Sequence, residues 1–185
     1  MPALTDLTSD RMSEARSRAS RVRFMLFDID GVFTDGQLLF GPEGEHLKVF
    51  HVHDGHGLKL LQRAGITPAV ITGRDSKPLR VRLAALGIEH AVFGTEDKRP
   101  AAEAILQTLG LDWTQAAAMG DDWPDLPMMT RCALACAPAN AQAEVLAQAH
   151  YVTRLRGGEG AVRELCDLLL VASGRYAQLL QEYLL

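Results

Sequence analysis

Short apolar runs divide the chain, and each run ends in a glycine or a polar residue. The first run, residues 24–27, is followed at once by Asp28-Ile29-Asp30-Gly31. Later runs are PAVITG, HAVFG, AAAMG, ALACA and AHYVT, and the apolar residues in them show little alternation. Short apolar runs without alternation are typical of strands that are buried on both faces of a parallel sheet.

Helical patterns lie between these runs. Three segments carry apolar residues at helical spacing and end in a glycine, namely residues 54–65, 76–87 and 97–110. Because strands and helices alternate along the chain, we predict an α/β fold with a Rossmann-like, doubly wound parallel sheet that helices cover on both sides.

One segment, residues 36–52, interrupts this alternation. It contains two extended runs that flank Gly41-Pro42-Glu43-Gly44, a turn sequence that predicts a small β-hairpin. The chain shows no internal repeat, low-complexity tract or linker. We therefore expect a single domain over residues 1–185, with a polar N-terminal arm over about 1–20 and a helical tail over about 160–185.

The charge and the apolar runs exclude several classes of protein. A net charge of −4 argues against a nucleic-acid-binding protein, which needs a basic face. No apolar stretch is long enough to span a membrane, and the N-terminal segment lacks the apolar centre of a secretory signal. The three cysteines lack metal-ligand spacing, so we expect buried thiols in a reducing cytoplasm.

Polar residues follow the predicted strands where ligands bind in such a sheet. Asp28 and Asp30 follow the first strand, Thr72 follows PAVI, and Asp121 begins an acidic GDDWPD segment, while Lys98 opens a helix. Several carboxylates at one sheet edge repel one another and need a cation, and a site made of oxygen ligands suits Mg²⁺. A carboxylate, a hydroxyl, a lysine and Mg²⁺ together predict a site that handles phosphate.

These four motifs, DIDGV-T, ITGR, Lys98 in EDKRP, and GDDWPD, resemble those of the haloacid dehalogenase superfamily. The second aspartate of the first motif implies a phosphatase. FHVHDGHGLKLL and GGEGAVRELCDLLL extend the resemblance to the 3-deoxy-D-manno-octulosonate 8-phosphate (KDO 8-phosphate) phosphatases of Gram-negative lipopolysaccharide synthesis. That family has no large cap domain, which fits a small hairpin in its place.

The resemblance implies a two-step hydrolysis. Asp28 would attack phosphorus to form an aspartyl-phosphate, and Asp30 would protonate the sugar oxygen and then activate water. Thr72, the Gly73 amide and Lys98 would hold the phosphoryl oxygens. The Mg²⁺ ligands would be Asp28, the Asp30 backbone carbonyl and Asp121, and the supporting acids would be Asp122 and Asp125.

The resemblance also implies contacts with the anionic sugar acid. Besides Asp30, Gly73 and Lys98, the residues carried over are His51, Val52, His53, Asp54, Gly55, Lys59, Arg74 and Arg82. The family more often has Arg or Leu where His53 stands. His51, His53 and His56 also leave open a protein-bound zinc ion.

Two other interpretations remain open at this point. Related phosphatases act on a nine-carbon 2-keto-3-deoxy sugar acid phosphate, and related non-catalytic domains form tetramers. A Ca²⁺ loop at Asp28 lacks its final glutamate, and the glycine-rich RGGEGAVRE lacks the context of a dinucleotide site. The apolar hairpin runs and the resemblance predict a homotetramer that joins through the hairpins, with a C-terminal tail covering a neighbour's site.

Overall fold

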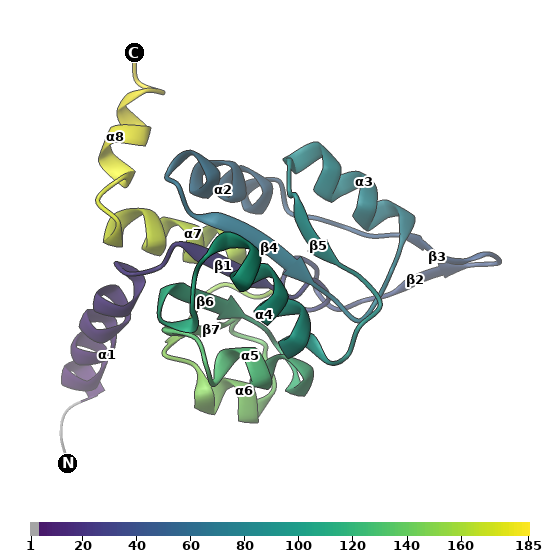
Figure 1. Ribbon diagram of the computed structural model, residues 1–185, viewed down its shortest axis with the longest axis horizontal. Coiled ribbons are helices and arrows are strands. Elements are labelled where there is room, and N and C mark those ends of the chain that lie inside the picture. Colours follow the sequence, from purple (N-terminus) through teal and green to yellow (C-terminus); the bar gives the residue numbers. More distant parts are fainter. Residues whose placement is uncertain (1–3) are drawn as a thin grey trace.

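A parallel sheet of six strands forms the centre of the molecule, in the order β5-β4-β1-β6-β7-β8 (Figure 1). The structure, a computed structural model, describes the backbone of residues 4–185 and the side chains of residues 10–185. The strands are β1 (Phe24–Phe27), β4 (Thr67–Ile71), β5 (His90–Val92), β6 (Ala116–Met119), β7 (Leu134–Ala137) and β8 (Tyr151–Val152). The prediction of a doubly wound parallel α/β sheet is confirmed.

Helices cover both faces of this sheet. The helices of one face are α1 (Leu4–Ala19), α2 (Val52–Arg63), α3 (Lys77–Leu86) and α7 (Ala161–Ala172), and those of the other are α4 (Lys98–Leu109), α5 (Leu126–Met129) and α6 (Ala143–Gln148). Met25 and Phe27 pack into the first core, whereas Phe24 and Leu26 pack into the second. All four side chains are fully buried, which explains why the first apolar run shows no alternation.

The predicted hairpin consists of β2 (Leu39–Gly41) and β3 (Gly44–Leu47), which pair antiparallel in a separate two-stranded sheet. In Figure 1 it projects from the body of the molecule, beyond α3. Four apolar side chains of this segment are exposed, and we call them the exposed hairpin face: Leu39, Phe40, Leu47 and Val49.

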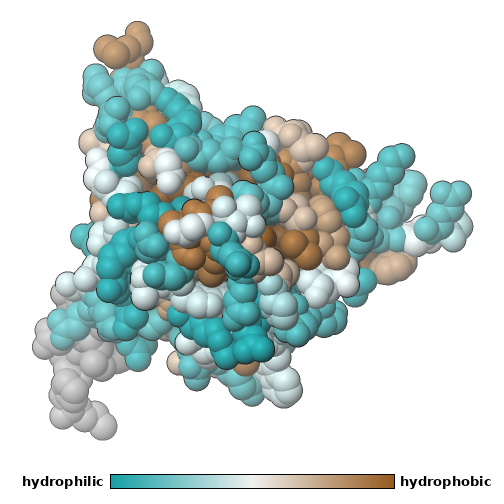
Figure 2. Space-filling model, viewed as in Figure 1, coloured by the Kyte–Doolittle hydropathy of each residue, from teal (hydrophilic) through white to brown (hydrophobic). Residues whose placement is uncertain are grey.

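Both terminal segments are helical. The predicted N-terminal arm forms α1 from Leu4 onward, and residues 1–3 lie outside the described part of the chain. The predicted tail contains α7 and α8 (Tyr176–Gln181). Two short 3₁₀ turns lie elsewhere in the chain, at Trp113–Gln115 and Trp123–Asp125. Beyond α8 the chain ends in apolar residues, visible at the top of Figure 2, where Leu184 is 70% exposed.

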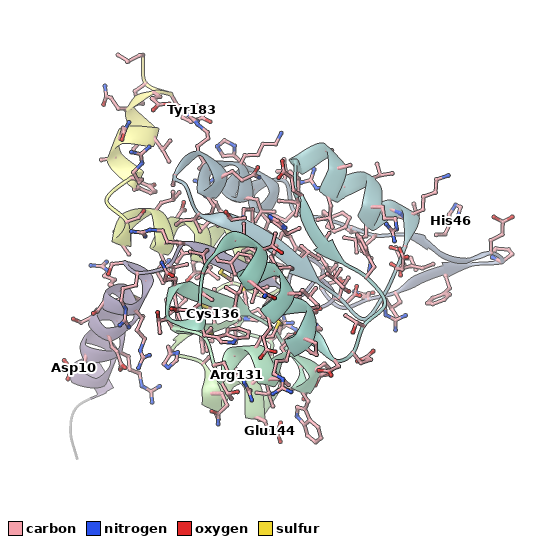
Figure 3. The ribbon with its side chains drawn as sticks, in the orientation of Figure 1. Asp10, His46, Arg131, Cys136, Glu144 and Tyr183 are labelled. Atoms are coloured by element: carbon pink, nitrogen blue, oxygen red, sulfur yellow. The ribbon has the colours of Figure 1, made fainter. Side chains whose placement is uncertain are left out.

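The tail contacts α2, on the first face of the sheet. Arg63 of α2 donates a hydrogen bond to the Tyr183 hydroxyl at 3.0 Å and pairs with Glu182. The Tyr183 ring also meets the His56 ring edge to face at 5.6 Å, and Figure 3 shows Tyr183 beside the end of α8.

Two expectations from the composition concern the cysteines and the membrane. Cys132, Cys136 and Cys166 are free and buried, and Figure 3 places Cys136 within the fold. Among the described helices, none has both the length and the apolar character that crossing a membrane requires.

Candidate active site

The carboxyl ends of β1, β4 and β6 lie side by side because β1 pairs with both neighbours in register. Phe27 is aligned with Val70 on one side and with Met119 on the other. The residues that follow these strands therefore meet in a cavity of about 200 Å³. The cavity is lined by Asp28, Asp30, Thr72, Gly73, Arg74, Glu96, Lys98, Asp121, Asp122, Pro124 and Asp125.

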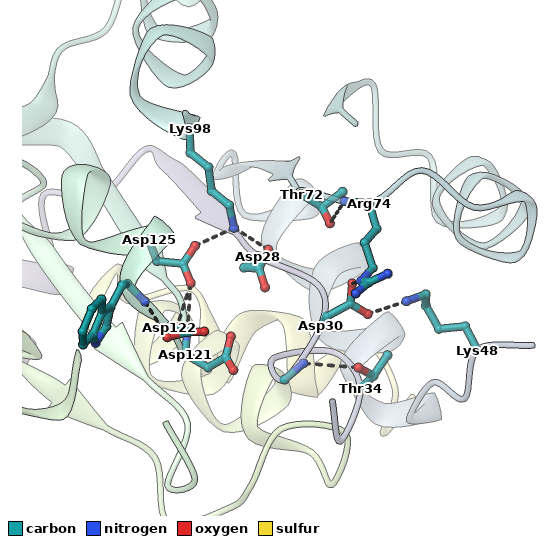
Figure 4. Close-up of polar contacts among 12 residues, drawn as sticks. Asp28, Asp30, Thr34, Lys48, Thr72, Arg74, Lys98, Asp121, Asp122 and Asp125 are labelled. Carbon is teal, nitrogen blue, oxygen red and sulfur yellow. Dashed lines mark hydrogen bonds and ion pairs between the residues drawn. The ribbon is translucent and has the colours of Figure 1, made fainter. Parts of the chain in front are cut away.

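Lys98 lies at the centre of this site, where it opens α4 and is only 3% exposed (Figure 4). Its ammonium group donates to Asp28 Oδ1 at 2.5 Å and to Asp125 Oδ1 at 2.6 Å. We call Asp28, Lys98 and Asp125 the buried charge triad. Burial alone would lower the pKa of Lys98, but the charges of Asp125 and Asp28 outweigh it and raise the pKa. Lys98 is therefore a fixed positive charge.

Asp125 is held from both sides. Its Oδ2 accepts hydrogen bonds from the backbone N–H groups of Asp121 at 3.0 Å and Asp122 at 3.3 Å. Asp122 in turn caps the turn that contains Asp125, since its carboxylate accepts from the Trp123 N–H. Both oxygens of Asp125 thus have partners, which makes Asp125 a support for Lys98 and for the loop.

The acids of this site repel one another. Burial, followed by the charge of Asp125, raises the pKa of Asp28 to about 7, although Lys98 opposes the shift. Burial and the charges of Asp28, Asp125 and Asp122 raise the pKa of Asp121 to about 8. A bound cation would relieve this repulsion and restore the charged carboxylates.

The positions of the acids fit a metal ion. Carboxylate oxygens of Asp28, Asp121 and Asp125 lie within 4.8 Å of one another. Gly31 has a φ of +87°, and a Cβ there would lie 2.1 Å from Asp121 Oδ2, so the backbone after Asp30 passes directly against the Asp121 carboxylate. Since both oxygens of Asp125 already have partners, Asp28 and Asp121 are the acids of this group that remain available to a cation, and the predicted ligand role of the Asp30 carbonyl stays a prediction.

Asp30 lies at the open side of the cavity, between two basic side chains. Lys48 donates to its Oδ1, and Arg74 Nε lies 3.8 Å from its Oδ2 (Figure 4). Arg74 was expected here, but the sequence-based prediction missed Lys48. The apolar residues around Lys48 made HLKVFHV a hairpin strand, and no local signal indicated that one lysine within it turns inward.

Thr72 and Gly73 form the wall that faces Lys98. Thr72 is buried, and its Oγ1 accepts from the Arg74 N–H at 3.3 Å. A Cβ on Gly73 would lie 2.7 Å from Glu96 Oε1, so a second residue missed by the prediction, Glu96, covers this glycine. The predicted catalytic residues Asp28, Asp30, Thr72 and Lys98 therefore lie around one cavity.

The predicted sugar-acid contacts on α2 lie outside that cavity within the described part of the chain. Asp54 is buried between α2 and α7, where its Oδ1 accepts from the Arg163 N–H at 2.8 Å, and burial raises its pKa. The rings of His51 and His53 meet at 5.0 Å, whereas His56 faces Tyr183, so the three histidines do not converge on one point.

The other predicted contacts differ in their exposure to solvent. Val52 and Lys59 are exposed on α2, and Gly55 lies beneath the Arg82 guanidinium, since a Cβ on Gly55 would meet it at 2.3 Å. Arg82 lines a second, larger groove of about 710 Å³ between the hairpin and α3, together with Lys48 and other residues. The roles of these residues toward a sugar acid stay predictions.

Comparison with known proteins agrees with this geometry. A family model described as haloacid dehalogenase-like hydrolase matches residues 94–165, which include Lys98 and the GDDWPD segment. The 3-deoxy-D-manno-octulosonate 8-phosphate phosphatase KdsC of Yersinia pestis is 45% identical over 158 residues, covering 85% of this chain and 84% of the relative.

Solved structures agree as well. The 3-deoxy-D-manno-octulosonate 8-phosphate phosphatase of Moraxella catarrhalis, in complex with a magnesium ion, a phosphate ion and KDO, has a TM-score of 0.90 at 35% identity and covers 93% of this chain and 99% of its own. The cobalt-bound phosphatase YrbI of Haemophilus influenzae has a TM-score of 0.87 at 39% identity, with coverages of 91% and 99%. The chain thus belongs to the KdsC family of 3-deoxy-D-manno-octulosonate 8-phosphate phosphatases, within the haloacid dehalogenase-like hydrolases.

Proposed function

We propose that this protein hydrolyses KDO 8-phosphate to KDO and inorganic phosphate, as a step in the supply of lipopolysaccharide precursors. The observation that carries the proposal is the meeting of Asp28, Asp30, Thr72 and Lys98 around one cavity in a chain of the KdsC family. The complete set of reactive groups favours catalysis over a purely structural, tetramer-forming role.

The first step transfers the phosphoryl group to the protein. Asp28 attacks phosphorus through a carboxylate oxygen, so that a new P–O bond forms while the bond from phosphorus to the sugar oxygen breaks. Lys98 orients Asp28 and draws charge from the phosphoryl oxygens, which the Thr72 hydroxyl and the Gly73 N–H also hold. Asp30 gives its proton to the departing sugar oxygen.

The second step releases phosphate. Asp30, now deprotonated, takes a proton from a water molecule, whose oxygen attacks the aspartyl-phosphate and frees Asp28. Both of its roles require Asp30 to face the phosphoryl group from the open side of the cavity, opposite the buried charge triad.

The cofactor of this reaction is Mg²⁺, which Asp28, the Asp30 carbonyl and Asp121 would hold, and it would supply positive charge to the phosphoryl group and to the acids. Asp122 and Asp125 keep the loop and Lys98 in place. Arg74 and Arg82 supply positive charge toward the carboxylate of the sugar acid, assisted by the His51–Gly55 segment and Lys59.

Phosphate release from two substrates tests this proposal. The purified protein is incubated with KDO 8-phosphate or with the nine-carbon 2-keto-3-deoxy sugar acid phosphate, in Mg²⁺ and after exhaustive chelation. We expect a higher kcat/KM for the eight-carbon substrate and no turnover without metal. Full activity after chelation would disprove the metal assignment. A higher kcat/KM for the nine-carbon substrate would assign the protein that substrate in place of KDO 8-phosphate.

We also propose a homotetramer located in the cytoplasm. The exposed hairpin face is apolar and invites pairing between subunits, and the three free thiols suit a reducing compartment. We propose further that the tail covers a neighbour's site, since Leu184 and Leu185, beyond its contacts with α2, are apolar and exposed. Light scattering at micromolar concentration tests the assembly, and a monomer would refute it.

A chain truncated after Ser173 tests the tail. We expect reduced turnover of the sugar phosphate with the tetramer retained. Because the tail also buries Leu179 and contacts Arg63, a thermal melt of the truncated chain is needed beside the kinetic assay.

A further inference from the structure

Lys48 is the one basic residue of the described hairpin segment, residues 36–50, whose ion pairs lead into the catalytic cavity. It follows β3 directly, and its side chain is only 1% exposed although both neighbours, Leu47 and Val49, point outward. Its ammonium group donates to Asp30 Oδ1. Glu45 Oε1 lies 2.7 Å away on the other side, close enough for an ion pair although the angle is not that of a hydrogen bond.

The burial of Lys48 requires an explanation. Removing an ammonium group from water is unfavourable unless it is paired, and a lysine on a projecting hairpin could extend into solvent at no such penalty. Two carboxylates compensate its charge: Glu45 from β3 and Asp30 from the loop after β1. The hairpin is thereby tied to Asp30 at its base.

The contact with Asp30 is also directional. Lys48 occupies Oδ1, while Oδ2 lies 3.8 Å from Arg74 Nε, which is beyond hydrogen-bond distance. The two oxygens of Asp30 are therefore not equivalent. One is held by a donor, and the other has no donor within hydrogen-bond distance among the described residues.

We propose that Lys48 is a positioning residue for the reaction: it fixes the Asp30 carboxyl group so that Oδ2 faces the departing sugar oxygen. The inference rests on the proposed role of Asp30 as general acid. Lys48 itself touches neither the phosphoryl group nor the reacting oxygen, and it acts through Asp30. The hairpin that replaces a cap domain thus supplies part of the acid catalyst.

A positioning role predicts a dependence on the leaving group. A general acid matters most when the departing oxygen is strongly basic, as in a sugar alcohol, and least when it is a stabilised phenolate. Lys48→Met should lower kcat/KM about 100-fold for KDO 8-phosphate and less than about threefold for p-nitrophenyl phosphate. The loss for phenyl phosphate should lie between these two values. Lys48→Arg, which keeps the charge and a donor, should recover most of the loss.

Lys77→Met is the matched control, since Lys77 lines the groove beside Lys48 but is exposed on α3. Lys77→Met should leave the ratio of kcat/KM for phenyl phosphate to kcat/KM for p-nitrophenyl phosphate unchanged. Equal losses on phenyl and p-nitrophenyl phosphate in Lys48→Met would show a structural role and overturn the inference. An effect confined to the KM for the sugar acid phosphate would make Lys48 a substrate contact and overturn it as well.

Asp30→Asn separates the inference from the proposed function on which it rests. If Asp30→Asn shows the leaving-group dependence and Lys48→Met does not, the proposed role of Lys48 is wrong and the proposed role of Asp30 stands. If Asp30→Asn lowers kcat/KM, which reports the first step and not the hydrolysis of the aspartyl-phosphate, equally on all three substrates, the proposed acid role of Asp30 fails and the inference falls with it. If Lys48→Met does not fold, Lys48→Gln in the same assay decides the question.

Discussion

At the carboxyl edge of the sheet, the buried charge triad lies almost completely out of solvent, and Lys98 donates to both of its carboxylates. On the hairpin the distribution is reversed: Phe40 is 63% exposed and Val49 71% exposed, while Lys48 is buried. The edge keeps its charges inside and the hairpin keeps its apolar groups outside. Asp30 is the point where the two regions meet, because it belongs to the loop after β1 and pairs with the hairpin.

This contrast separates two functions of the fold. The nucleophile must stand in one position, and hydrogen bonds from buried, packed elements hold it there. The hairpin has few neighbours of its own, so its position depends on Lys48 and on whatever covers its exposed face. We therefore expect changes at the sheet edge to abolish the chemistry and changes on the hairpin to weaken it.

The largest effect is expected from Asp28→Asn. An amide is a poor nucleophile toward phosphorus, so turnover of KDO 8-phosphate should fall below about one per cent of the wild-type rate while binding survives. Stopped assays of phosphate release measure this. Asp97→Asn, an exposed neighbour of Lys98, serves as the control and should stay fully active. An active Asp28→Asn protein would remove Asp28 from the nucleophile role.

The next largest effect concerns the metal-free protein. An acid whose pKa is higher in the folded than in the unfolded state binds more protons when folded, so it stabilises the fold at low pH and loses that effect as the pH rises toward the folded pKa. In the folded protein the pKa of Asp28 is about 7 and that of Asp121 is about 8, against an ordinary value of 3.8 when unfolded. Both acids therefore follow this rule.

The metal-free protein should therefore lose stability between pH 5 and pH 8. One pKa unit corresponds to about 1.4 kcal/mol, and because the two shifts share one repulsion they do not add in full, so we expect a loss of several kcal/mol. Urea unfolding in a chelator at each pH measures the free energy of unfolding. Added Mg²⁺ should restore stability at pH 8, and Asp121→Asn should flatten the dependence. A metal-free protein that is more stable at pH 8 than at pH 5 would contradict this.

Arg74→Ala is expected to have an intermediate effect, because Arg74 stands between the two regions and is half exposed. Its loss should raise the KM for KDO 8-phosphate about tenfold and leave that for p-nitrophenyl phosphate, which has no carboxylate, nearly unchanged. Arg80→Ala, which loses an exposed pair with Asp75 and a cation–π contact with Phe93 but lies outside the cavity, is the control. Equal effects on both substrates would place Arg74 at the phosphate.

The smallest effect on turnover is expected from Phe40→Asp. A charge on the exposed hairpin face should dissociate the proposed tetramer and lower kcat/KM by a few-fold, because the buried charge triad is unaffected. Light scattering measures the assembly state, and the kinetic assay on the same sample measures kcat/KM. Val171→Asp, at an apolar position that is 46% exposed on α7, controls for an added surface charge. A tetramer that persists in Phe40→Asp would exclude the hairpin face as the interface.

Much of the site followed from the sequence because strand ends obey a local rule. A run of buried apolar residues that stops at Phe27, Ile71 or Met119 must deliver the next polar side chain to one edge of a parallel sheet. That rule predicted Asp28, Thr72 and Asp121 without knowledge of their contacts. The resemblance to a family then suggested a role for each residue, which the rule alone does not do.

The contacts between distant segments were decided only in the tertiary structure. Nothing in the sequence around Asp125 indicates that both its oxygens are occupied, and nothing around Lys48 indicates that it points inward while Leu47 and Val49 point outward. Asp54 likewise turns to α7 instead of the cavity. Periodicity reports which face of an element is apolar, but the partner of a buried charge is chosen by packing between elements, because a charge is stable there only where an opposite charge from another segment meets it.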